Sequence, residues 1–191
     1  MALFQNKYRI ETTRLKGWNY SSSGYYFITI CTKNKKKYFG KINNGHIILT
    51  QIGEIVSKEW KKTEEFRNNV KLDFWTIMPN HIHGIVIIDK NVTQEIVETH
   101  SDASLPLHDN LSNIVRGFKA SVSKQVHEAG YLEFEWQSRY YDHIIRNENS
   151  LNKIRKYIKY NAIKWEYDRE NLNEISFNEK KKYWKSFLKK R

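Results

Sequence analysis

The sequence predicts an α+β sandwich, in which helices cover one face of an antiparallel sheet. Strand-length runs of β-branched and aromatic residues alternate with amphipathic stretches of helix length, and the expected element order is β, β, α, β, β, α, β, α. The chain has 191 residues, of which 39% are hydrophobic, so it can bury one sizeable core. We therefore expect one domain over residues 1–170, which opens with an irregular basic arm over 1–22, and a basic tail over 171–191.

The first half of the chain is expected to supply four strands and one helix. An aromatic and β-branched run after Gly24 predicts a strand over 25–32. A turn at 43–45 leads into a short strand over 46–49. Thr50 is the expected N-cap of a helix that carries apolar residues at helical spacing and ends before 68. Two further strands are predicted over about 70–78 and 82–89.

The second half is expected to begin with a long loop over 91–110. A helix follows over about 110–128, with its apolar residues on one face and its basic residues elsewhere. After Gly130 the sequence predicts a strand over about 140–145. A last helix should begin near 149 and carry apolar residues to Ile158 or onward to Trp165.

Charge indicates a polyanionic partner. The chain has 33 Lys and Arg against 21 Asp and Glu, which gives a net charge of +12. Its many aromatic residues are suited to stacking on unpaired bases, so nucleic acid is favoured over an anionic membrane surface. No apolar run approaches the length of a membrane span, and the N-terminus lacks a secretory pattern. With Cys31 as its single cysteine, the chain is expected to be cytoplasmic.

His81 and His83 form the first candidate site. Residues two apart on a strand project to the same side, so both imidazole rings can reach one metal ion. The alternative is two unrelated histidines that share this spacing by accident. A structural zinc site is disfavoured because such sites are rich in cysteine, and this chain has one.

Tyr157 and Asn161 form the second candidate pair. They lie four residues apart on the last predicted helix, so their side chains share a face about one turn from each other. A nucleophilic hydroxyl and an amide oxygen that can bind a hard cation would then lie together. The alternative is a half-buried tyrosine beside a surface asparagine.

Four blocks of sequence carry a resemblance to a known family. They are Arg14–Tyr20, Gly24–Thr32, Trp75–Gly84 and Tyr140–Asn147. In this order they resemble the REP-associated tyrosine transposases, which are stand-alone relatives of the single-tyrosine insertion-sequence transposases among the HUH nucleases. The resemblance spans about residues 9–165. It implies a ferredoxin-like or RRM-like antiparallel sheet, with helices mainly on one face and the histidine pair on a central strand.

The resemblance also implies roles for the candidate residues. The family pattern Tyr-Ile-x-x-Asn-Pro matches from Tyr157, the implied nucleophile, to Asn161, the implied third metal ligand beside His81 and His83. Ala162 departs from the pattern, because the family has proline there. The implied cofactor is Mg²⁺ or Mn²⁺. The competing tyrosines are Tyr140, Tyr141 and Tyr160, and the implied supporting residues are His143 and Arg146.

The implied activity is that of a single-stranded DNA endonuclease and strand transferase that acts beside DNA hairpins through a 5′-phosphotyrosine intermediate. Such a protein would be bacterial, nucleoid-associated when bound to DNA, and monomeric, with a homodimer as the alternative. A rolling-circle replication initiator, a relaxase-like nuclease and a noncatalytic RRM-like binder remain alternatives. The expected DNA contacts are basic residues spread along the chain: Arg14, Lys16, Arg116, Lys119, Arg139 and Arg146.

Overall fold

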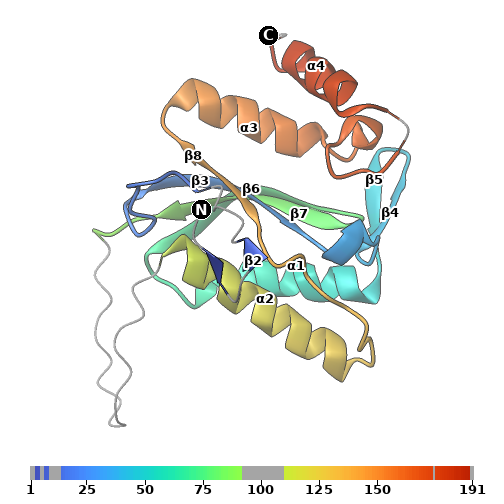
Figure 1. The fold of residues 1–191 in the computed structure, drawn as a ribbon, viewed down its shortest axis with the longest axis horizontal. Helices are drawn as coiled ribbons and strands as arrows, with labels where there is room; N and C mark the ends of the chain where they lie inside the picture. Colours follow the sequence, from blue (N-terminus) through green and yellow to red (C-terminus); the bar gives the residue numbers. More distant parts are fainter. Residues whose placement is uncertain (1–2, 5–6, 9–13, 92–109, 174, 190–191) are drawn as a thin grey trace.

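A four-stranded antiparallel sheet forms the centre of the fold (Figure 1). The structure is a computed structural model that describes residues 3–4, 7–8, 14–91, 110–173 and 175–189. The strand order is β6-β7-β3-β8, and helix α1 precedes β6 while helix α2 precedes β8. This βαββαβ arrangement is ferredoxin-like, which confirms the predicted fold class. The bounds are β3 (Gly24–Cys31), α1 (Gln51–Glu65), β6 (Val70–Met78), β7 (His81–Ile88), α2 (Leu111–Glu128) and β8 (Tyr141–Ile145).

Two small hairpins stand apart from this sheet. Strands β4 (Gly40–Asn43) and β5 (His46–Leu49) pair across the turn predicted at 43–45, although the sequence analysis anticipated only the second of them. Strands β1 (Leu3–Phe4) and β2 (Lys7–Tyr8) pair within the predicted arm. The loop predicted over 91–110 lies almost wholly outside the described residues. No helix among the described residues has the length and apolar character that a bilayer span requires.

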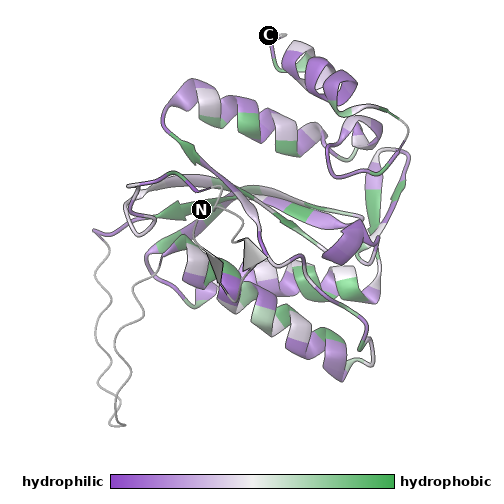
Figure 2. Cartoon of the chain, in the orientation of Figure 1, coloured by the Kyte–Doolittle hydropathy of each residue, from purple (hydrophilic) through white to green (hydrophobic). Residues whose placement is uncertain are grey.

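The main core lies between one face of the sheet and helices α1 and α2 (Figure 1). Alternate residues of β3 and β7 supply the sheet side of this core, and both helices supply amphipathic faces, so their surfaces are mixed in hydropathy (Figure 2). Side chains cap both helices: Thr50 accepts from the backbone N–H of Gly53, as predicted, and Asn110 accepts from that of Asn113. These caps satisfy N–H groups that the helices leave unpaired.

Helix α3 (Glu148–Tyr160) lies on the opposite face of the sheet, apart from α1 and α2 (Figure 1). Its buried Leu151 and Ile158 pack against Phe27, Ile85 and Ile145 of the sheet. This second core is small, and the histidines of β7 share its face because they alternate in phase with Ile85.

The chain beyond α3 departs from the sequence analysis in two respects. The helix ends at Tyr160, with Asn161 as its C-cap, and Trp165 lies in a separate 3₁₀ turn, η2 (Trp165–Tyr167). The segment expected as a tail contains helix α4 (Phe177–Phe187), whose Ser176 forms a capping box with Glu179. Its Trp184 is buried and donates a hydrogen bond to the carbonyl of Tyr167, so α4 is anchored to the η2 turn.

Gly84 provides a test of the packing between the sheet and α1. A Cβ atom at this position would lie 2.6 Å from Cζ2 of the fully buried Trp60. We expect Gly84→Ala to lower the free energy of unfolding by about 1–3 kcal/mol, because the indole must shift within a filled core. Urea denaturation measures this change. Gly24→Ala is the matched control, since its Cβ would meet only the Tyr26 ring at 3.7 Å or more; equal losses in both variants would contradict the packing argument.

Candidate active site

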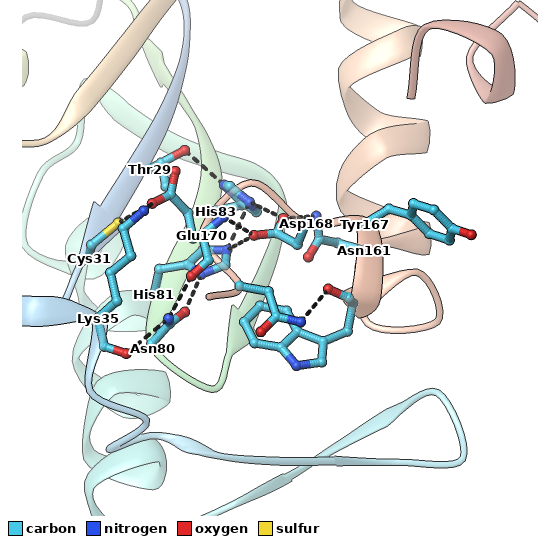
Figure 3. A network of polar contacts seen from close by, with 12 residues as sticks. Thr29, Cys31, Lys35, Asn80, His81, His83, Asn161, Tyr167, Asp168 and Glu170 are labelled. Atoms are coloured by element: carbon cyan, nitrogen blue, oxygen red, sulfur yellow. Dashed lines mark hydrogen bonds and ion pairs between the residues drawn. The ribbon is translucent and has the colours of Figure 1, made fainter. Parts of the chain in front are cut away.

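His81 and His83 lie side by side on the face of the sheet that α3 covers (Figure 3). Both side chains are buried, and their Nε2 atoms are 2.9 Å apart. Pairing with β3 fixes their positions, since His81 lies opposite Cys31 and His83 opposite Thr29. The alternation predicted for this strand therefore brings two ring nitrogens to one point.

Asp168 completes a cluster with the two histidines. Its carboxylate oxygens lie 3.8 Å from Nε2 of His81 and 3.5 Å from Nε2 of His83. The ligand atoms of these three buried residues all lie within 4.8 Å of one another. Helix α3 ends at Tyr160 and the η2 turn then brings Asp168 back to the sheet. The backbone N–H of Glu170 donates to Oδ1 of Asp168 at 2.7 Å. The sequence analysis missed this residue, because no local pattern marks it.

Tyr157 and Asn161 face the same carboxylate from the end of α3. The Tyr157 hydroxyl donates to Oδ2 of Asp168 at 2.9 Å and lies 3.1 Å from Nε2 of His83. The Asn161 amide donates to the same Oδ2 at 2.7 Å. Its own Oδ1 is buried without a hydrogen-bond partner in the structure. The predicted helix face thus does meet the histidine pair.

Burial and charge set the protonation of this cluster. Burial, and then the neighbouring His83, lowers the pKa of His81 to about 3, so its ring is neutral at neutral pH. Burial acts to raise the pKa of Asp168, but His81, His83 and the Asn161 amide outweigh it and hold that pKa well below its ordinary value. Burial and the Asp168 charge raise the pKa of the Tyr157 phenol well above 10. At neutral pH the cluster therefore holds an ionised Asp168, a neutral His81 ring and an un-ionised Tyr157 phenol.

These donor groups fit a divalent cation. Ligand atoms about 2.1 Å from one ion lie about 3 Å apart in an octahedral shell, which is close to the spacing of the two Nε2 atoms. The Asp168 carboxylate offers charge, and the unpartnered Oδ1 of Asn161 offers a neutral oxygen. Mixed imidazole and oxygen donors suit Mn²⁺ or Mg²⁺. The thiol of Cys31 donates a hydrogen bond to Glu170, so the cluster does not resemble a metal site built from thiolates.

Asn80 orients the His81 ring. Its Nδ2 lies 3.1 Å from the carbonyl of Lys35 and 2.8 Å from that of Glu170, and a carbonyl only accepts hydrogen bonds. The remaining Oδ1 of Asn80 must therefore accept from Nδ1 of His81, at 2.8 Å. A neutral His81 with its proton on Nδ1 presents the Nε2 lone pair to the cluster. Oγ1 of Thr29 lies 2.8 Å from Nδ1 of His83 and positions the second ring.

The two residues expected to support the site lie beside it. His143 is exposed on β8 and lines the cavity that adjoins Tyr157. Arg146 is exposed just after β8 and lines a neighbouring hollow. Neither residue is in the cluster of His81, His83 and Asp168, so their roles stay predictions.

Two of the expected DNA contacts are engaged by other groups of the fold, and the role of all six in DNA binding stays a prediction. Arg14 hydrogen-bonds Ser112 at 2.5 Å, lies 3.8 Å from Asp142 and contacts the ring of Tyr140, so it braces the fold. Lys119 donates to the carbonyl of Gln137 at 2.6 Å, and burial lowers its pKa to about 8. Lys119 and the exposed Arg116 both lie on α2, which covers the face of the sheet away from the histidines. Lys16 and Arg139 are exposed in loops.

Three further cations that the sequence analysis did not name line the cavity beside Tyr157: Lys153, Arg169 and Lys181.

Comparison with known proteins finds similarity in sequence and in structure. No family model matches the chain. An uncharacterized protein of Haemophilus influenzae (strain ATCC 51907 / DSM 11121 / KW20 / Rd) is 39% identical over 170 residues, which cover 83% of this chain and 91% of that protein. The solved structure of a REP-associated tyrosine transposase bound to a REP hairpin superimposes with a TM-score of 0.52 at 20% identity, over 83% of this chain and 74% of that one. The likeness shows a shared fold.

The tautomer of His81 is directly measurable. At mildly alkaline pH we expect His81 to carry its proton on Nδ1, because the Asn80 oxygen can only accept there. Long-range ¹H–¹⁵N NMR correlations on protein with ¹⁵N-labelled histidine distinguish the two tautomers. His127 is an internal control of the opposite kind, since its Nε2 lies 3.0 Å from the carbonyl of Phe134 and must donate. A proton on Nε2 of His81 would contradict the proposed orientation.

Proposed function

The chain belongs to the same family as the Haemophilus influenzae protein and has the fold of a REP-associated tyrosine transposase, and from this premise we propose that it is a transposase-type nuclease. It would cut and rejoin single-stranded DNA beside a hairpin, with Tyr157 as the nucleophile and Mg²⁺ or Mn²⁺ as the cofactor. One observation carries the proposal: the Tyr157 hydroxyl lies 3.1 Å from Nε2 of His83 and 2.9 Å from Oδ2 of Asp168. The nucleophile and the candidate metal ligands therefore converge from α3, β7 and the η2 turn.

The proposed cleavage is a transesterification at a DNA phosphate. The Tyr157 oxygen forms a bond to phosphorus, and the bond from phosphorus to the 3′ oxygen of the neighbouring nucleotide breaks. The products are a 5′-phosphotyrosine on the protein and a free 3′-hydroxyl once that oxygen takes a proton. Because the phosphodiester energy is retained in the protein link, attack by another 3′-hydroxyl reverses the step and joins strands without a nucleotide cofactor.

The residues of the cluster have separate tasks in this reaction. When bound, a divalent cation held by His81, His83 and an oxygen of Asp168 or Asn161 supplies positive charge for the nonbridging phosphate oxygens. Asp168 also accepts the phenolic hydrogen bond, so it is placed to receive the proton that Tyr157 must lose. The raised pKa of the phenol and the lowered pKa of Asp168 oppose this transfer in the resting cluster, so the proton must leave as the Tyr157 oxygen bonds to phosphorus.

The whole candidate site comes from one chain. Tyr157 reaches His83 within the same molecule, so no helix need be exchanged with a second copy to assemble the cluster. This observation supports the expected monomer. The hairpin partner is transferred from the solved transposase, whose structure contains a REP hairpin; any short palindromic repeats found in the DNA beside the gene are the first substrates to test.

Covalent capture tests the nucleophile. The protein is mixed with a labelled hairpin oligonucleotide that carries single-stranded flanks, in the presence of Mn²⁺, and adducts are separated on a denaturing gel. We expect an adduct with the native chain and none with Tyr157→Phe, which removes only the attacking oxygen. Tyr160→Phe, on the same helix, is the matched control and should form the adduct at the native rate. Persistence of the adduct in Tyr157→Phe would exclude this residue, and its absence with every flanking palindrome would favour a noncatalytic binder.

Asp168→Asn tests the carboxylate. This variant keeps a side chain of similar size but removes both the ligand charge and the proton acceptor. We expect adduct formation to fall about 100-fold or more, and Mn²⁺ affinity measured by calorimetry to fall as well. Asp73→Asn is the control, because Asp73 pairs with Arg155 of α3 at 2.9 Å but lies outside the cluster. Near-native adduct formation in Asp168→Asn would remove Asp168 from the proposed chemistry.

A further inference from the structure

A cavity of about 500 Å³ opens directly beside Tyr157 and His83. Helices α3 and α4, strand β8 and the turn after η2 enclose it, so segments far apart in the sequence build it together. Its volume falls within the range of sites that hold small organic ligands. His83 and Tyr157 account for one wall of this cavity, and the remaining walls have no assigned role.

The remaining walls combine aromatic rings with positive charge. Tyr141 of β8 and Phe177 of α4 are both large exposed aromatics, with 45% and 54% of their surfaces accessible. The guanidinium carbon of Arg169 lies 6.0 Å from the centroid of the Tyr141 ring and 5.0 Å from that of Phe177. Lys153 and Lys181 add two further cations.

The charge of the cavity favours an anionic ligand. Its one acidic lining residue is Glu170, which is paired with Lys35 at 2.7 Å. Arg169, Lys153 and Lys181 therefore face a cavity whose single carboxylate is already neutralised. A flat hydrophobic ligand that carries negative charge matches both the rings and the cations, and an unpaired nucleotide has this chemistry.

A second hollow next to this cavity extends the surface on which a DNA strand can lie. It has a volume of about 380 Å³ and shares His143 and Ser150 with the first cavity. From there it extends to Arg146, which is exposed. The two hollows therefore adjoin at His143 and Ser150 and form a track that leads from Tyr157 to Arg146. An extended strand laid in this track would keep its bases unpaired.

We propose that the cavity beside Tyr157 is a nucleotide subsite, which holds an unpaired base next to the scissile phosphate against Tyr141 and Phe177, with its backbone phosphate near Arg169. The proposal deepens the proposed function, on which it rests. It assigns Tyr141, which the sequence analysis weighed as an alternative nucleophile, a stacking role instead. It also explains why α4 belongs to the catalytic unit, since α4 supplies Phe177 and Lys181 to the subsite.

Equilibrium binding tests the subsite without any cleavage. The Tyr157→Phe protein is titrated into fluorescently labelled hairpin oligonucleotides whose single-stranded flanks carry one abasic residue at successive positions, and anisotropy gives each affinity. We expect one flank position at which loss of the base weakens binding about fivefold or more. In Tyr157→Phe combined with Tyr141→Ala, binding to the intact oligonucleotide should weaken by a similar factor, and the abasic penalty at that position should disappear. Equal abasic penalties with and without the Tyr141 ring would overturn the proposal.

Matched variants separate stacking from general effects. Phe66→Ala removes an exposed aromatic at the end of α1 and should leave both the affinity and the abasic profile unchanged. Arg169→Gln should weaken binding to every oligonucleotide and reduce the slope of log affinity against log salt by about one, whereas Lys58→Gln on α1 should do neither. An unchanged salt slope in Arg169→Gln would remove the phosphate contact. Because these measurements use a protein without the Tyr157 hydroxyl, a position-specific penalty with no adduct in the native chain would reject the nuclease and retain the subsite.

Discussion

The buried carboxylate of Asp168 is the interaction on which the candidate site depends. It accepts hydrogen bonds from the Tyr157 hydroxyl, the Asn161 amide and the backbone of Glu170, and it lies within 4 Å of both histidine Nε2 atoms. A carboxylate without solvent is stable only when such donors surround it. The same contacts therefore stabilise the buried charge and bring the helix, the strand and the turn to one point.

Much of the fold follows from periodicity that is visible in the sequence. Strand-length apolar runs indicated β6 and β7, and the helical spacing with Thr50 as N-cap indicated α1. The pairing of β3 with β7 and β8 depends on contacts between distant residues. Short-range patterns do not encode such pairing, and the family resemblance implied only a ferredoxin-like or RRM-like sheet with the histidine pair on a central strand.

The site was only partly accessible to the same reasoning. His81 and His83 share a face because strand geometry requires it, and Tyr157 was indicated by the family pattern around it. Asp168 reaches the site only because α3 ends at Tyr160 and η2 reverses the chain, and a helix that continued to Trp165 would have carried this part of the chain away. Helix α4 was not predicted for a related reason. Its basic sequence is typical of a solvated tail, and what anchors it is the contact of Trp184 with the distant carbonyl of Tyr167.

The two faces of the sheet divide stability and chemistry between them. Helices α1 and α2 bury the large core on one face, and the opposite face carries only a small core beside a cluster of polar groups. Because of this division, α3 and the η2 turn can hold polar groups that are costly to desolvate without destabilising the main core. Trp184 then serves both purposes, because its ring lies 4.5 Å from that of Tyr157 and its indole N–H bonds the carbonyl of Tyr167. It packs on the Tyr157 ring while it fixes the turn that presents Asp168. Because His81, His83 and Asp168 are buried, their electrostatic contacts act in a medium of low dielectric constant.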